Sequence, residues 1–252
     1  MTALITGASS GIGKDMAIIL SNLGYDLILV SRSKQELLVV QKLIKTNSRI
    51  IPLDLSKEEN SFKLFEEVKN ENIDILINNA GFGIYGFFDK TDIASEIKQL
   101  ELNTKAVLIL TKLFLPLMEK KNYGYILNVA SSAAYLPGPL MSGYYASKAY
   151  VLRLTESIHG ELKAKKSNVY IGALCPGPVD TNFNNNAGIK FSAPTISSYK
   201  VANYALKKMF KKKIVIVPGM YMKLSIFFVR FIPHCILIKI AYFIQRRKII
   251  YE

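Results

Sequence analysis

The sequence predicts an α/β fold in which a single parallel sheet of about seven strands is covered by helices on both faces. Short apolar runs rich in β-branched residues alternate with helical stretches along most of the 252-residue chain. The runs are continuously apolar, which is typical of strands covered on both sides. Strand, helix and strand in succession imply parallel pairing with right-handed crossovers, so we expect a doubly wound, Rossmann-like sheet in one domain.

Seven runs are the predicted strands. In chain order they are Ala3–Thr6, Leu27–Val30, Arg49–Leu53, Ile73–Ile77, Tyr125–Val129, Val169–Leu174 and Ile214–Val217. An amphipathic helix through Leu23 should follow the first strand, and a long helix should begin near Gly143. Residues 181–198 are rich in Asn, Ala, Gly and Ser and predict a long loop. Such loops often serve as lids or binding loops, and a passive surface insertion is the alternative.

Residues 220–252 predict an apolar helical extension that follows a domain of residues 1–219. Lys223, Arg230, Pro233 and Lys239 interrupt the apolar stretch, which argues against a membrane-spanning helix and favours two short amphipathic helices broken at Pro233. Their apolar faces could cover the sheet edge, contact a second subunit in a homo-oligomer, or lie on an anionic membrane. Packing or oligomerisation is the preferred interpretation.

Composition limits the classes of partner and the compartment. The net charge of +14 favours polyanionic partners, but the lysines at 207–208 and 211–213 accompany no nucleic-acid motif, so we predict no nucleic acid. Cys175 and Cys235 match no metal or redox spacing and predict two inert buried thiols. His159 and His234 form no ligand cluster, so we predict no metal. The chain starts with a strand rather than a secretory signal, which predicts a cytoplasmic protein.

A glycine-rich loop follows the first strand and precedes a helix. In Gly7-Ala8-Ser9-Ser10-Gly11-Ile12-Gly13, glycine permits a tight turn and a close approach of backbone to a pyrophosphate, while the helix start offers N–H groups and a positive dipole end. The alternative is that these glycines only allow a tight turn and bind no ligand. Because this loop opens a series of βαβ units, we predict a dinucleotide site.

The residues after the second and third strands bear on which dinucleotide binds. Folds that select NAD place a carboxylate at the end of the second strand, where this chain has Ser31-Arg32. Arg32, with nearby Lys14, could bind a ribose 2′-phosphate, which predicts NADP(H). Arg32 as a solvated residue at a helix start is the alternative. Asp54 and Leu55 should meet the adenine ring, unless Asp54 only caps the next helix.

Tyr144 and Lys148 share one face of the long helix because they are four residues apart. A tyrosine with a pKa near 10 is a poor acid or base at neutral pH. A nearby ammonium group, together with a positively charged oxidised nicotinamide, should lower the pKa of Tyr144 by favouring the phenolate.

These motifs occur in an order that resembles the short-chain dehydrogenase/reductase family. The resemblance covers about residues 2 to 181 and rests on the spacing Gly7-x-x-x-Gly11-x-Gly13, on Asn78-Asn79-Ala80-Gly81, on Ser131, and on Tyr144-x-x-x-Lys148. Further matches are Asn103 in Leu102-Asn103-Thr104 and the segment Pro176-Gly177-Pro178-Val179-Asp180-Thr181.

The resemblance implies roles for individual residues. Tyr144 would protonate the carbonyl oxygen, Ser131 would hydrogen-bond that oxygen, Lys148 would also hold the nicotinamide ribose, and Asn103 would position a water that links Lys148 to solvent. The implied cofactor-binding set is Gly7, Ser9, Ser10, Gly11, Ile12, Gly13, Arg32, Asp54, Leu55, Asn79, Ala80, Gly81, Tyr144, Lys148, Pro176, Gly177, Val179 and Thr181.

The predicted function is therefore an NADP(H)-dependent oxidoreductase that transfers hydride between nicotinamide and a carbonyl or alcohol. The expected substrate walls are 82–88, 133–141 and 181–198, and they include many apolar residues. This favours an apolar ketone or a 3-oxoacyl-type substrate. The alternative is a catalytically silent NADP-binding protein with a regulatory or scaffolding role on the same fold.

Overall fold

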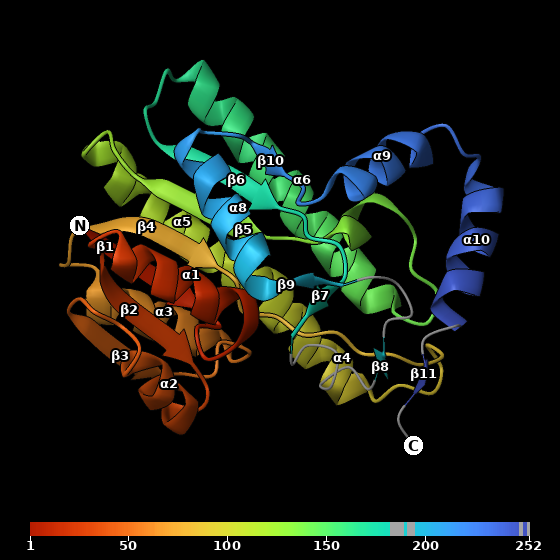
Figure 1. Cartoon of the computed structure of the whole chain (residues 1–252), viewed down its shortest axis with the longest axis horizontal. Coiled ribbons are helices and arrows are strands. Elements are labelled where there is room, and N and C mark those ends of the chain that lie inside the picture. The colour runs from red at the N-terminus through yellow and green to blue at the C-terminus, as the bar shows by residue number, and fades with distance from the viewer. Residues whose placement is uncertain (182–188, 191–194, 247–248, 251–252) are drawn as a thin grey trace.

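The computed structural model describes residues 1–181, 189–190, 195–246 and 249–250, and the side chains of 189–190 and 249–250 are not described (Figure 1). Most of the predicted loop 181–198, including Phe191, therefore lies outside the described residues. In chain order the elements are β1 (Thr2–Thr6), α1 (Gly11–Asn22), β2 (Asp26–Ser31), α2 (Lys34–Gln41), β3 (Ser48–Pro52), α3 (Glu58–Val68), β4 (Ile73–Asn78), α4 (Ile93–Leu100), the π-helical turn η1 (Glu101–Lys105), α5 (Ala106–Lys120), β5 (Tyr125–Val129), the 3₁₀ turn η2 (Ser132–Tyr135), α6 (Ser142–Ala164), β6 (Tyr170–Leu174), β7 (Val179–Asp180), β8 (Ile189–Lys190), β9 (Ile196–Ser197), α8 (Ser198–Phe210), β10 (Val215–Ile216), α9 (Met220–Val229), α10 (His234–Arg246) and β11 (Ile249–Ile250).

The predicted fold class is confirmed by a seven-stranded sheet in the order β10-β6-β5-β4-β1-β2-β3, in which every pairing is parallel. Six predicted strands occur within a residue or so of their expected bounds, and the seventh is shortened to Val215–Ile216. The strand order reverses between β1 and β4. A crevice therefore opens at the carboxyl ends of these two strands, which is where open α/β sheets bind ligands.

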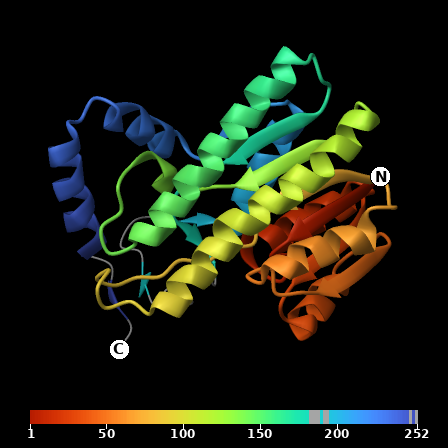
Figure 2. The ribbon, with the colours of Figure 1, turned by 180° about the vertical axis from the view of Figure 1, so that it is seen from behind.

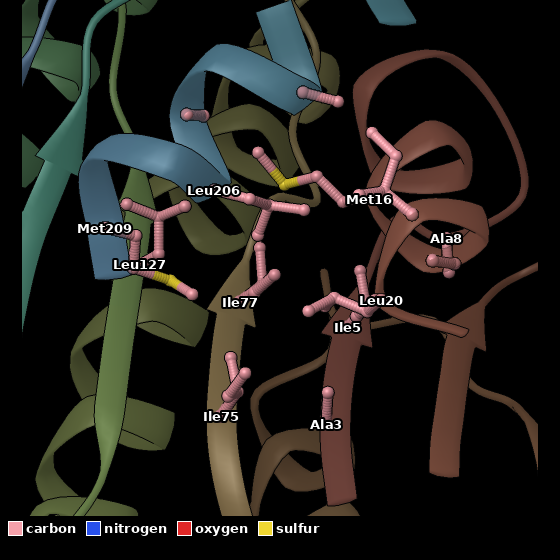
Figure 3. Packing of buried hydrophobic residues seen from close by; sticks show 14 of the residues in the cluster. Ala3, Ile5, Ala8, Met16, Leu20, Ile75, Ile77, Leu127, Leu206 and Met209 are labelled. Carbon is pink, nitrogen blue, oxygen red and sulfur yellow. The ribbon is translucent and has the colours of Figure 1, made fainter. Parts of the chain in front are cut away.

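Two hydrophobic layers sandwich the sheet because successive strand residues point to opposite faces. Ala3 and Ile5 of β1 pack toward α1, α2 and α8, whereas Leu4 packs toward α3, α5 and α6. Figure 3 shows the first layer, where Met16 and Leu20 of α1 and Leu206 and Met209 of α8 meet Ile75 and Ile77 of β4. This double burial explains why the central strands are mostly apolar.

The C-terminal extension consists of α9 and α10, with Pro233 between them as expected. Figures 1 and 2 both place the two helices at the end of the molecule away from β2 and β3. They pack against η2 and the start of α6 rather than along the strand at the sheet edge. Beyond α10, β11 pairs with β8 in antiparallel fashion, so the end of the chain returns to the 181–198 segment.

The prediction of two buried thiols is wrong for one cysteine. Cys175 is fully buried directly after β6, but Cys235 is exposed in the first turn of α10. Cys235 lies outside the buried face of α10, which consists of Leu237, Ala241 and Gln245.

Candidate active site

A cavity of about 630 Å³ lies along the carboxyl ends of the central strands and collects nearly all the predicted site residues. Of the predicted set, only Gly13 and Asn103 are not in its wall. The wall also contains Glu36, which the sequence analysis did not single out, Met141 from the expected substrate wall 133–141, and Tyr145, for which packing was expected. The predicted residues in the wall are Gly7, Ser9, Ser10, Gly11, Ile12, Arg32, Asp54, Leu55, Asn79, Ala80, Gly81, Ser131, Tyr144, Lys148, Pro176, Gly177, Val179 and Thr181.

The glycine loop is shaped for close approach of backbone to a ligand. Gly7 has φ +63° and Gly11 φ +53°, a region that favours glycine. Gly13 lies behind the loop, where a Cβ would come within 2.3 Å of the Gly7 carbonyl oxygen, so it permits close packing of α1 rather than touching the cavity. The first turn of α1 carries no acidic residue, and its N–H groups have no partner within the helix. This end of the cavity suits an anionic group.

Asn79 joins the end of β4 to the glycine loop. Its Nδ2 donates to the carbonyl oxygens of Thr6 and Gly7, both at 3.0 Å, and the backbone N–H groups of Asn79 and Ala80 donate to Thr6 Oγ1. The bonds also fix the width of the crevice between β1 and β4.

Arg32, Glu36 and Asp54 lie at the other end of the cavity. Arg32 follows β2 directly and precedes Ser33, whose Oγ caps α2 by accepting from the Glu36 N–H. Lys14, which was expected to assist Arg32, is not in the cavity wall. Asp54 closes a turn by accepting from the N–H and the hydroxyl of Ser56, and it does not cap α3, which begins after Lys57.

The hydroxyl groups of Tyr144 and Ser131 are hydrogen-bonded to each other at the middle of the cavity. Ser131 follows β5 and also accepts from the Ala133 N–H at 3.1 Å, which fixes its side chain. One helical turn beyond Tyr144, Lys148 is only 5 % exposed and its Nζ donates to the Val129 carbonyl at 2.8 Å. The strand end and the helix together thus bring these three side chains to one point.

The pKa of Tyr144 differs from the expected direction. Burial raises the pKa of Tyr144 to about 12, which outweighs the lowering by the Ser131 hydrogen bond. The Lys148 Nζ lies 5.9 Å from the centre of the Tyr144 ring and directs a hydrogen bond to backbone, so its charge does not offset the burial. Burial also lowers the pKa of Lys148 to about 8. Both groups are therefore protonated at neutral pH.

Asn103 stands behind this point, fully buried in the π-helical turn η1. It pairs with the backbone of Phe82 in both directions and donates to Ser147 Oγ, which in turn donates to the Tyr144 carbonyl. A Cβ on Gly81 would lie 2.8 Å from Asn103 Oδ1 and 3.3 Å from Lys148 Nζ. Glycine at 81 therefore leaves the space between these two groups open. No sequence pattern indicates the link through Ser147.

The C-terminal helices complete one side of the site. The ring of Tyr145 covers Gly138 so closely that a Cβ there would meet it at 2.1 Å. The Tyr145 hydroxyl accepts a hydrogen bond from Nε2 of Gln245, a buried residue of α10, while the Gln245 carbonyl accepts from the hydroxyl of Tyr85. From α9, Met222 packs against Gly177. Sequence reasoning missed Gln245, because nothing in the pattern pairs residues that are 100 positions apart.

Comparison with known proteins gives one family. Residues 1–191 match the family described as short chain dehydrogenase. The chain is 32% identical over 206 residues to a very-long-chain 3-oxoacyl-CoA reductase of Anas platyrhynchos, an alignment that covers 78% of this chain and 65% of the reductase, which is less than two thirds of its length.

Solved structures agree with this result. A short-chain dehydrogenase from Sphingobium yanoikuyae in complex with NADPH has a TM-score of 0.82 and 30% identity, covering 87% of this chain and 88% of that one. A short chain dehydrogenase/reductase from Burkholderia phymatum in complex with NAD has a TM-score of 0.81 at 24% identity, covering 89% and 91%, and supports the fold.

Proposed function

Because the chain belongs to the short-chain dehydrogenase family, we propose that it is an NADP(H)-dependent oxidoreductase that reduces an apolar ketone or a 3-oxoacyl-type substrate, with Tyr144 as the general acid. The observation that carries the proposal is the hydrogen-bonded pair of Tyr144 and Ser131 at the cavity wall, with Lys148 one helical turn away. We assign the chemistry to residues 1–219, with 181–198 as the substrate loop and 220–252 as an extension.

The chain's own groups are suited to protonating a carbonyl oxygen. Tyr144 holds its proton at neutral pH, since its pKa is raised to about 12, and it can donate that proton as negative charge develops on the oxygen. Ser131 donates a second hydrogen bond to the same oxygen. In this proposal Lys148 supplies a positive charge near the phenolate that remains, and Asn103, hydrogen-bonded to Phe82, positions a water that links Lys148 to solvent.

The residues present fit a nicotinamide dinucleotide. The cradle of Gly7 and Gly11 and the start of α1 would hold the pyrophosphate, and Asp54 and Leu55 would flank the adenine. Lys148 would hold the nicotinamide ribose, while the 176–181 segment would lie along the nicotinamide. When bound, the reduced cofactor supplies the hydride.

The proposal of NADP over NAD rests on Arg32. It occupies the end of β2, where a carboxylate would select NAD, and its guanidinium can make charge-assisted bonds to a ribose 2′-phosphate. Glu36 lines the same region, one turn into α2. Arg32→Gln should therefore weaken NADPH binding about tenfold or more while leaving NADH binding nearly unchanged. Isothermal titration with both cofactors measures this difference, and equal losses for both would contradict the assignment.

The apolar substrate class is supported by the wall near Tyr144. Phe82, Met141, Tyr145 and Pro178 line it. An apolar wall with a few convergent polar groups is typical of a site for an apolar small molecule. The name of the Anas platyrhynchos relative, a reductase of 3-oxoacyl thioesters, points in the same direction.

The first test follows NADPH oxidation by the purified chain with a panel of bulky apolar ketones and 3-oxoacyl thioesters. Tyr144→Phe should lower kcat/KM by about 10²–10⁴. Tyr150→Phe, on the same helix but with an exposed side chain, is the matched control and should retain turnover. If both the native chain and Tyr144→Phe bind NADPH tightly and neither turns over any member of the panel, the silent NADP-binding alternative replaces the reductase proposal.

A further inference from the structure

The outward surface of the C-terminal extension is apolar to an unusual degree. Helix α9 contains ten residues, of which Ile226 alone is buried. The side chains of Tyr221, Phe227, Phe228 and, just beyond the helix, Phe231 are 81 %, 53 %, 59 % and 71 % exposed. A helix that is apolar around most of its circumference normally lies in a protein core or in lipid. In the described residues, no core covers this one.

Helix α10 has two apolar faces. The inner face consists of Leu237, Ala241 and Gln245, spaced four residues apart, and is buried against the site. The rest of the circumference is largely exposed and mostly apolar, so packing on the protein accounts for only one of the two faces. The exposed apolar side chains of α10 are Ile236, Ile238, Ile240, Phe243 and Ile244.

The charge on this surface has a single sign. The sequence contains no acidic residue between Asp180 and Glu252. Arg230, Lys239 and Arg246 are exposed among the apolar side chains of α9 and α10. Aromatic and aliphatic residues edged by arginine and lysine fit the boundary between acyl chains and anionic headgroups.

A second copy of the chain fits this surface poorly. A twofold contact places the same patch on both partners, so it would bring Arg230, Lys239 and Arg246 of each copy together, and neither α9 nor α10 carries a carboxylate to pair with them. By contrast, the exposed apolar side chains of α4 lie next to Glu96, Lys98 and Glu101, which carry charges of both signs. Charge complementarity therefore selects an anionic partner for α9 and α10.

We propose that the outward faces of α9 and α10, together with Phe231, dock the protein on the surface of a lipid bilayer that contains anionic phospholipids. The helices would lie in the plane of the interface, because no helix among the described residues is long and apolar enough to cross a membrane. The inner faces of the same helices touch Gly177 through Met222 and Tyr145 through Gln245. Docking would thus bring one wall of the cavity close to the lipid. Vesicle binding does not depend on the proposed chemistry.

The test measures sedimentation of the full chain with vesicles of phosphatidylcholine alone or with phosphatidylserine added. We expect at least about tenfold tighter binding to the anionic vesicles, because each cation near the surface adds to the attraction. The double variant Phe228→Glu/Phe231→Glu should lose about tenfold or more in binding, since each exposed phenylalanine would otherwise be buried in the interface.

The matched control is Leu23→Glu/Phe62→Glu, which makes the same kind of change at exposed apolar positions on α3 and at the end of α1. It should bind like the native chain, and circular dichroism should show all three proteins folded. Equal binding to neutral and anionic vesicles, or full binding by the α9 variant, would overturn the proposal. Loss of a dimer in that variant, without vesicle binding by the native chain, would assign the surface to a second copy.

Cys235 offers an independent readout. It is exposed in α10, whereas Cys175 is fully buried, so a thiol-reactive fluorophore that senses polarity should label Cys235 selectively. Anionic vesicles should shift its emission to shorter wavelength, and high salt should reverse the shift. An emission spectrum unchanged by vesicles that bind the protein would show that another surface makes the contact.

Discussion

Lys148 should cost the protein stability, and Lys148→Met should recover part of that cost. Burial lowers the pKa of Lys148 to about 8 from its ordinary 10.5. At about 1.36 kcal/mol per pKa unit, holding the charged form in the folded protein costs about 3 kcal/mol below pH 8. Methionine has a similar shape and no charge, but it leaves the Val129 carbonyl without its Nζ donor, a loss of about 1–3 kcal/mol. The expected net gain near neutral pH is about 0.5–2 kcal/mol.

The sign of this effect depends on pH. Between about pH 8 and 10.5 the unfolded chain binds more protons at Lys148 than the folded chain does, so native stability contributed by this group rises with pH in that window. Above this window Lys148 is neutral in both the folded and the unfolded chain, so its burial no longer carries a charge penalty. The variant then differs only by the lost hydrogen bond to the Val129 carbonyl. Lys148→Met should therefore be the more stable protein at neutral pH and the less stable one near pH 10.5, with little or no reductase activity throughout.

Urea unfolding of both proteins at several pH values from neutral to 10.5 measures the difference directly. Lys45→Met, at an exposed lysine, is the matched control and should change the free energy of unfolding by no more than about 0.5 kcal/mol. Parallel stability curves for the native chain and Lys148→Met, or a variant that is less stable at every pH, would refute the burial argument.

Two individual contacts and the pKa of Lys148 lead to three further predictions. Gly13→Ala should destabilise the fold by about 1–3 kcal/mol, because its Cβ would lie 2.3 Å from a carbonyl oxygen of the glycine loop. Gly160→Ala, with open space around it in α6, should instead stabilise the fold by about 0.5–1 kcal/mol. Thermal unfolding of the two variants measures the difference. Tyr145→Phe should leave the buried amide of Gln245 without its acceptor and speed hydrogen exchange in α10, and unchanged exchange would count against the contact. The kcat/KM for reduction should fall as pH rises through about 8, when Lys148 loses its proton, and Lys148→Arg should move that fall to higher pH if the variant is active.

The fold and most of the site could be predicted from sequence because local patterns encode them. Mostly apolar runs mark strands buried on both faces, and β1 and β4 are buried along almost their whole length. The order of the motifs then places Gly7, Asn79, Ser131 and Tyr144 at strand ends or helix starts, and parallel pairing brings those ends to one edge.

Other features could not be predicted because they depend on burial and on distant contacts. The pKa of Tyr144 rises rather than falls because desolvation outweighs a lysine that is turned toward backbone. Lys14 follows the glycine loop directly in sequence, but it is not in the cavity wall. The sequence left three positions open for the C-terminal extension. The inner face of the extension is held in place by Gln245 and Met222, which contact residues that are far away along the chain.

The buried polar groups of the site lower the stability of the fold, and the apolar packing around them offsets this cost. Lys148 is buried with a lowered pKa, and among the described side chains neither polar atom of Gln99 nor the Oε1 of Gln245 has a hydrogen-bond partner. Each such group reduces the free energy of unfolding, by about 1–3 kcal/mol for an unpaired polar atom. Gln99 lies beside Gly143 and Gln245 beside Tyr145, so these two costs fall near the start of α6. The two apolar layers of the sheet offset them, and stabilising substitutions at this point should therefore come at the expense of turnover.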